Sequence, residues 1–154
     1  MLDIYIDADG CPVKDEVYKV AARYNMKVRL AANSWMRTPE GDHVELVIVD
    51  DHKDAADDWI VEQVEEHDIV VTGDILLAAR CIEKGASVLG LKGREFTEDN
   101  IGGAVATRNL MSDLRDAGER TRGPSAFDKR DRSQFLQSLD RMVHVVRRKA
   151  PPQR

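Results

Sequence analysis

The 154-residue chain has only two cysteines, Cys11 and Cys81. Two thiols cannot build a disulfide framework, a zinc site of four thiolates or a Cys-x-x-Cys redox pair here, so they suit a reducing compartment. The sequence also lacks the run of about 18 apolar residues that a membrane-spanning helix requires. Residues 1–10, MLDIYIDADG, have no basic leader. We therefore expect a cytoplasmic protein that is neither secreted nor inserted into a membrane.

Histidine is also scarce, and the side chains needed for nucleophilic catalysis by a thiol are not grouped. The four histidines are scattered along the sequence, at positions 43, 52, 67 and 144. Cys11 is near the expected start of a helix, which lowers a thiol pKa, but the aspartates around it oppose that effect and no histidine is adjacent. We interpret Cys11 as a structural residue, and a mechanism centred on histidine has little support.

Acidic and basic side chains are unevenly distributed along the chain. The formal net charge of −5 combines residues 1–100, with 11 basic and 22 acidic side chains, and residues 101–154, with 12 basic and 6 acidic ones. A polyanion would be attracted to the second part and repelled by the first unless a cation is bound there. The alternative is that the two parts neutralise each other within the fold.

The pattern of apolar residues predicts alternating strands and helices. Continuous runs rich in Val and Ile indicate strands buried on both faces, at residues 2–7, 27–31, 44–49, 68–72 and 87–91. Amphipathic segments between them predict helices from Pro12 to about Tyr24, from a cap at Asp54, and from Asp74 to a stop at Gly85. This alternation predicts an α/β fold with a mainly parallel sheet covered by helices on both faces.

The remaining segments complete the expected organisation. Residues 32–43 contain Pro39 and Gly41 without helical periodicity, and we expect a long loop of the kind that is often functional. Residues 98–117 and 131–149 are expected to form a helical C-terminal segment, with a turn at Gly123-Pro124 between them. The chain is thus expected to form one domain over residues 1–149, followed by a flexible tail at 150–154.

Acidic residues follow the predicted strands. Asp7 and Asp9 lie where the first strand ends, and Thr72 and Asp74 lie at the equivalent point of the fourth. Ligands of open α/β sheets bind outside the carboxyl ends of strands where the winding direction reverses. A strand order of 3-2-1-4-5 would therefore place Asp7 and Asp74 across one crevice. The segment VIVDDHKDAADDW adds further acids after the third strand and on the next helix, namely Asp50, Asp51, Asp54, Asp57 and Asp58.

Clustered carboxylates favour a divalent cation. Two of them 4 Å apart repel each other by roughly 4 kcal/mol at an effective dielectric constant near 20, and Mg²⁺ or Mn²⁺ would relieve that repulsion. The absence of a nearby His or Cys set favours these cations over zinc. The alternative for Asp54 and Asp74 is simple helix capping, although capping explains one acid per helix start and not both Asp7 and Asp9. Asp50, Asp51 and Asp58 are interpreted as solvated surface acids.

Four segments together resemble the YaiI/YqxD family of bacterial proteins, which is grouped with PIN-like domains. They are DADGCPVK at 7–14, DAADDWI at 54–60, TGDILLAARCIEKGA at 72–86 and RGPSAFDKRDRSQFLQSLD at 122–140. The resemblance implies a PIN-like fold in which acids at strand ends bind Mg²⁺ or Mn²⁺ and direct water at an RNA phosphodiester. It makes Asp7 and Asp74 the firmest metal ligands and Asp57 the next, with Asp9 standing in for an acid that PIN nucleases hold elsewhere.

These considerations give a set of expected site residues. We assign Asp7, Asp9 and Asp74 to catalysis, and the same three with Asp57 to metal binding. Substrate contacts are assigned to Lys14 and Thr72, which accompany the acids in their motifs, and to the basic residues Arg122, Arg130 and Arg132. The segment from Arg120 to Lys149 is predicted to be the electrostatic approach for RNA. The alternative is that Arg130 and Arg132 pair with acids of the same fold.

Two other functions remain open. IYIDADG also resembles the nucleophile motif of haloacid-dehalogenase-like phosphatases, but in that superfamily the paired aspartates follow the Thr and Lys motifs, whereas Asp50-Asp51 precedes Thr72 here. The other alternative is a binding module that holds RNA, a nucleotide or a partner protein without turnover. Cleavage of single-stranded RNA that depends on metal would separate the nuclease from this module.

Overall fold

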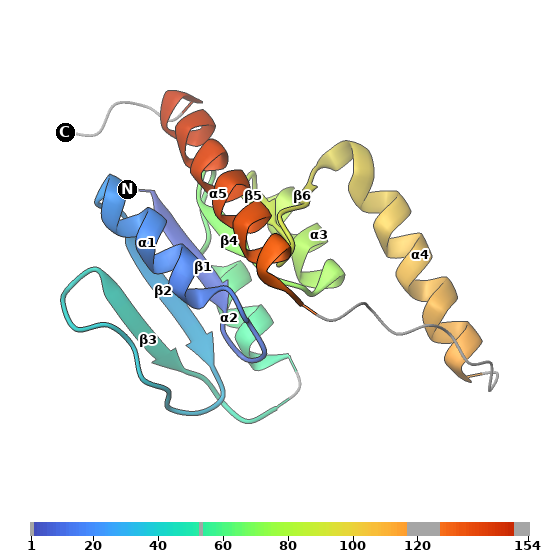
Figure 1. Ribbon diagram of the computed structural model, residues 1–154. Coiled ribbons are helices and arrows are strands. Elements are labelled where there is room, and N and C mark those ends of the chain that lie inside the picture. The colour runs from blue at the N-terminus through green and yellow to red at the C-terminus, as the bar shows by residue number, and fades with distance from the viewer. Residues whose placement is uncertain (1, 53, 117–126, 150–154) are drawn as a thin grey trace.

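A six-stranded sheet forms the centre of the molecule (Figure 1). The computed structural model describes residues 2–52, 54–116 and 127–149. The strand order is β3-β2-β1-β4-β5-β6, and every neighbouring pair is parallel except β5 and β6. The sheet therefore has the order 3-2-1-4-5 on which the expected meeting of Asp7 and Asp74 depends, and the winding direction reverses between β1 and β4. The strands are β1 (Asp3–Asp7), β2 (Lys27–Ala32), β3 (Val44–Ile48), β4 (Ile69–Val71), β5 (Ser87–Leu89) and β6 (Glu95–Phe96).

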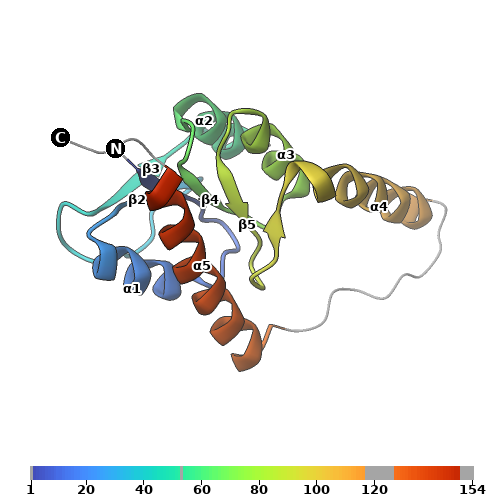
Figure 2. The same cartoon turned by 90° about the horizontal axis from the view of Figure 1, so that it is seen from above.

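Helices cover both faces of this sheet, as the sequence predicts. Figure 2 shows α1 and α5 on one face and α2 and α3 on the other, with α4 extending away beyond α3. The helices are α1 (Lys14–Tyr24), α2 (Ala55–Gln63), α3 (Ile75–Glu83), α4 (Glu98–Asp116) and α5 (Lys129–Lys149). None of the helices in the described residues is both long enough and apolar enough to span a membrane.

Two apolar cores follow from the alternation of side chains along the buried strands. Ile4 and Ile6 of β1 point to the core beneath α1 and α5, where Phe135 of α5 is fully buried. Tyr5, between them, points to the second core, which Ile60 of α2 and Leu77 of α3 fill. Because both faces of the sheet are buried, its central strands are continuous apolar runs and do not alternate between polar and apolar residues.

Several element boundaries differ from the prediction. The first helix begins at Lys14, two residues after Pro12. Asp54 occupies the position before α2, but its side chain forms no capping hydrogen bond, so the predicted cap is wrong. The last helix begins at Lys129 because Asp128 and Asp131 each accept a hydrogen bond from the other's backbone N–H, at 3.0 and 3.1 Å, and so form a reciprocal cap.

Some predicted features lie outside the described residues or were missed. The short strand β6 was not predicted, and it pairs antiparallel with β5 through only two residue pairs. Residues 33–43 contain no helix or strand, which confirms the expected loop. The turn at Gly123-Pro124, residue Arg122 and the tail at 150–154 lie outside the described part of the chain.

Candidate metal and phosphate site

Two aspartates end adjacent strands at one edge of the sheet. Asp7 is the last residue of β1, and Asp74 follows β4 directly before α3. Because β1 and β4 are parallel and pair Ile6 with Val71, their carboxyl ends emerge side by side. Gly10 has a φ of +75°, a conformation that favours glycine, and it allows the chain to turn sharply from β1 toward α1. The adjacent, parallel arrangement of β1 and β4 therefore brings the two aspartates to the same edge of the sheet, as the sequence predicts.

A chain of hydrogen bonds connects the two aspartates through Thr72. The Thr72 hydroxyl donates to Oδ2 of Asp7 at 3.1 Å and accepts from the backbone N–H of Asp74 at 2.9 Å. Oδ1 of Asp74 in turn accepts from the N–H groups of Leu76 and Leu77, at 2.9 and 3.2 Å. Asp74 is thus the N-cap of α3, which was the alternative to metal binding for this residue. Thr72 is fully buried, and its hydroxyl orients the Asp7 carboxylate from below.

Asp57 joins this cluster from α2. Its pKa is raised from 3.8 to about 7, first by burial and then by the negative charges of Asp74, Asp7 and Asp54, together with a side-chain hydrogen bond to Asp74. The pKa of Asp7 is also raised, mainly by burial and further by Asp74 and Asp9, although the hydrogen bond from Thr72 opposes the shift. These carboxylates therefore hold protons more tightly than free aspartate, as expected where several of them share one site.

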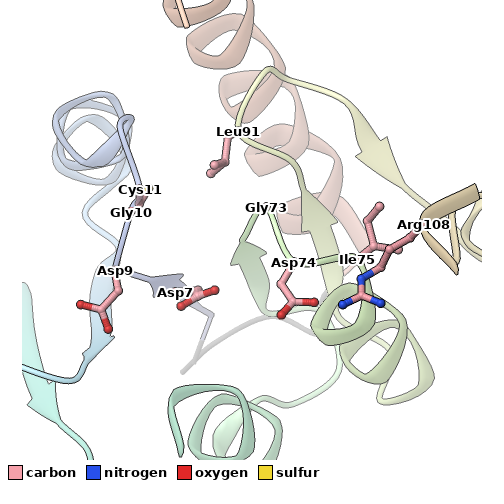
Figure 3. A pocket seen from close by; sticks show the side chains of 9 residues that line it. All are labelled: Asp7, Asp9, Gly10, Cys11, Gly73, Asp74, Ile75, Leu91 and Arg108. Carbon is pink, nitrogen blue, oxygen red and sulfur yellow. The ribbon is translucent and has the colours of Figure 1, made fainter. Parts of the chain in front are cut away.

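Asp9 lies at the exposed side of the cluster. Its Oδ2 accepts from the backbone N–H of Asn33 at 2.9 Å, and the Asn33 side chain donates to the carbonyl oxygen of Asp50 at 3.0 Å. Asp9 thereby fixes the start of the long loop after β2. Figure 3 shows Asp7 between Asp9 and Asp74, with the Asp9 carboxylate turned away from the other two.

A cavity of about 370 Å³ opens over these groups, and we call it the acidic pocket. Its lining includes Asp7, Asp9, Asp74, Cys11 and, from α4, Arg108 (Figure 3). Among the described residues, no three His, Cys, Asp or Glu side chains are already placed to hold one metal ion together. A shared ion would thus require carboxylates to rotate. The donor set itself, oxygen ligands without nitrogen or sulfur partners, matches Mg²⁺ or Mn²⁺.

Cys11 and Lys14 shape the backbone beside the pocket. Burial raises the pKa of the Cys11 thiol, as expected for a structural cysteine. The Lys14 ammonium donates to the Cys11 carbonyl oxygen at 2.8 Å and thereby closes the turn between β1 and α1. Lys14 is only partly exposed, and its proposed contact with substrate would compete with this hydrogen bond.

Basic residues of α5 lie at both ends of the helix, with Arg141 between them. Arg132, near the first turn, donates to Oε1 of Glu16 at 3.1 Å and to the Pro12 carbonyl oxygen, and its guanidinium lies 4.9 Å from the centre of the Phe127 ring. Near the other end, Arg147 stacks over Tyr24, the last residue of α1, and is therefore remote from the acidic pocket. Arg130 is exposed near the first turn.

These contacts predict different effects for two neighbouring arginines. Arg132→Ala removes an ion pair and a bond to a backbone carbonyl, so we expect the free energy of unfolding to fall by about 1–2 kcal/mol. Arg130→Ala, at an exposed position, should change it by less than about 0.5 kcal/mol. Urea denaturation of both variants measures the difference. Equal stabilities, with a flatter salt dependence of RNA binding for Arg132→Ala, would instead assign Arg132 to the substrate.

Sequence reasoning missed Arg108 as a site residue. It comes from α4, about a hundred residues after the first acids, and it approaches the side of the pocket lined by Asp74 and Ile75 (Figure 3). Its segment, GGAVATR at 102–108, has no motif that marks a phosphate contact. Only the packing of α4 against α3 brings it to the acids.

The comparison with known families agrees with the four sequence segments. A model of the family described as "Uncharacterized BCR, YaiI/YqxD family" matches residues 5–145. The chain belongs to this family. The match includes every assigned acid, Lys14, Arg108, and the arginines of the C-terminal segment up to Arg132.

Relatives with about 50% sequence identity match nearly the whole chain. A UPF0178 protein of Rhodopseudomonas palustris is 52% identical over 150 residues, covering 97% of this chain and 95% of its own length. The UPF0178 protein of Rhodospirillum centenum is 53% identical, with 96% and 99% covered, and that of Parvibaculum lavamentivorans is 52% identical, with 99% and 100% covered. No solved structure matches this chain.

Proposed function

We propose that this YaiI/YqxD protein is a PIN-like nuclease that uses Mg²⁺ or Mn²⁺ to hydrolyse RNA phosphodiesters in the acidic pocket. The observation that carries the proposal is the convergence of Asp7, Asp57 and Asp74, from three elements, at the carboxyl ends of β1 and β4. The pKa values of Asp7 and Asp57, raised mainly by burial and further by the neighbouring carboxylates, support it, since a divalent cation would stabilise the ionised forms.

Each residue has a distinct part in the proposed site. Asp7, oriented from below by Thr72, and Asp74, fixed by the first turn of α3, would be the rigid ligands. Asp57 and Asp9 would complete the coordination after rotating toward them. A bound Mg²⁺ or Mn²⁺ would supply an activated water and neutralise the phosphate charge. Without that cation, the carboxylates would repel an RNA backbone.

A binding module without turnover is the second candidate, and one observation favours it. Among the described residues no three carboxylates are placed to hold one ion together, which is compatible with a pocket that binds without turnover. Such a module would use the same pocket to hold RNA through a bound cation.

Hydrolysis of RNA separates the two candidates. Purified protein with Mn²⁺ should cleave single-stranded RNA of mixed sequence, and EDTA or Asp7→Asn should remove the activity, because the reaction needs the metal to activate water. The control is Asp51→Asn, which neutralises an exposed acid outside the pocket. RNA that remains intact across varied sequences while still binding would favour the module, and cleavage that resists EDTA would contradict the proposed mechanism.

A further inference from the structure

A second cavity adjoins the acidic pocket along α4. It has a volume of about 620 Å³, within the range of about 300–1,000 Å³ typical of ligand sites. We call it the α4 groove. Ile75 and Arg108 line both cavities, so the groove continues directly from the wall of the pocket near Asp74. Nothing in the proposed hydrolysis requires this second cavity.

The groove has cationic side chains suited to phosphate. Arg94 and Arg108 line it, together with a single acidic residue, Asp99. Within the described residues Arg108 forms no ion pair, and the Arg94 guanidinium lies 5.3 Å from the centre of the Phe96 ring without an acidic partner. Because neither arginine forms an ion pair with a described carboxylate, both retain donors for an anionic ligand.

The rest of the lining provides apolar surface. Ile75 and Met111 belong to it, and Met111 is 40% exposed although it is a large apolar residue. After Ala104, none of the residues of α4 up to position 114 is buried, so this part of the helix exposes its side chains to solvent. Cations beside exposed apolar surface suit a single strand, whose bases are free to contact a protein, better than a duplex, whose bases are stacked inside.

A glycine keeps the groove open. Gly103 lines it, and a Cβ added there would meet no atom within 4 Å. Glycine in the middle of a helix destabilises it by roughly 0.5–1 kcal/mol relative to alanine. A Cβ at Gly102 would likewise meet no atom within 4 Å, but Gly102 does not line the groove. The two adjacent glycines therefore differ in whether a side chain added there would enter the groove.

We propose that the α4 groove binds the single-stranded RNA segment next to the phosphodiester in the acidic pocket. Arg108, at the shared wall, contacts the phosphate adjoining the one to be cleaved, and Arg94 contacts a phosphate further along the strand. The apolar wall at Ile75 and Met111 receives the bases. This inference rests on the proposed function of the acidic pocket and names the form of its substrate.

Filling the groove at Gly103 tests the inference. Gly103→Leu should weaken binding of a fluorescein-labelled single-stranded RNA, measured by anisotropy in Ca²⁺, by at least about tenfold, since the side chain occupies the path of the strand. Gly102→Leu should bind RNA like the wild type. Both variants should melt at the wild-type temperature or above, because leucine is favoured over glycine in a helix. Unchanged RNA affinity in Gly103→Leu would overturn the proposal.

Charge removal provides the second readout. Arg108→Gln and Arg94→Gln should each lower the log–log salt slope of RNA binding by about 0.7, the value for one phosphate contact on a single strand. Arg80→Gln is the control, because Arg80 is paired with Asp58 at 3.0 Å. Unchanged slopes, or equally tight binding of a duplex, would also overturn the proposal. Wild-type protein that binds RNA through the groove but never cleaves it would contradict the nuclease alone, whereas cleavage unaffected by Gly103→Leu would contradict the groove alone.

Discussion

Asp7→Asn and Asp74→Asn are each expected to lower the affinity for Mn²⁺, measured by calorimetry, by on the order of 100-fold or more. Even residues that only support a metal ligand contribute 10–100-fold to metal affinity, so loss of a charged ligand should cost at least as much. Neither substitution should destabilise the metal-free protein. Asparagine at position 7 still accepts from Thr72, and asparagine at position 74 still caps α3, because the amide oxygen replaces Oδ1.

The melting temperature distinguishes a metal site from a structural one. Removal of one negative charge from the cluster lowers the repulsion among the remaining carboxylates, so the metal-free variants should melt at the wild-type temperature or above. Asp51→Asn, which changes an exposed acid, should alter neither property. A loss of about 1 kcal/mol of stability in both variants, with Mn²⁺ still bound, would mean that the two carboxylates stabilise the fold and do not serve as metal ligands.

The stability of the metal-free protein is expected to fall as the pH rises toward 7, and Asp57 is expected to be the main cause. Its pKa is about 7 in the fold against 3.8 for ordinary aspartate. Between these values the folded protein holds a proton that the unfolded chain has released, so folding is favoured at low pH and the advantage is lost by about pH 7. Because Asp57 is only half-buried, we expect an effect on the order of 2 kcal/mol.

Asp57→Asn should flatten this dependence and raise the melting temperature of the metal-free protein at pH 8. Mn²⁺ competes with the same proton. The affinity of the wild type for Mn²⁺ should therefore increase by up to about tenfold for each unit by which the pH is raised, until about pH 7. Asp58→Asn is the matched control, since Asp58 is on the same helix but pairs with Arg80 away from the cluster. Urea denaturation between pH 5 and 8 provides the measurement. A pH dependence that persists in Asp57→Asn would exclude Asp57 as its source.

The sheet and the meeting of its acids could be predicted because both depend on local sequence pattern. Runs such as IVV at 69–71 are apolar on both faces, which indicates buried parallel strands and hence a carboxyl edge where Asp7 and Asp74 meet. The hydrogen bond of Asp9 to Asn33 could not be predicted in this way, because it depends on how the loop at 33–43 folds over the strand ends.

The position of α4 could not be derived from its own sequence. Ala104 is the only residue of 102–114 that is buried, so the helix has no broad apolar face that would indicate its partner. Its contact with α3 is decided by the three-dimensional arrangement of the domain. Arg108 and the groove therefore escaped prediction. The sequence left open whether Arg132 pairs with an acid of the same fold, and it did not identify its partners, which are Glu16 of α1 and the Pro12 carbonyl oxygen.

The origin of the site residues along the chain bears on how such a protein can evolve. The acids of the cluster all come from residues 7–74, at the ends of strands or on the helix packed beneath them, where the backbone is fixed by the central sheet. The walls of the groove come mainly from residues after 90, on a helix that contributes little to the cores. In the proposed site, substitutions on α4 would therefore change the contacts with the ligand at little cost to folding. The proposed chemistry at the acids could then be kept while the preferred ligand changes.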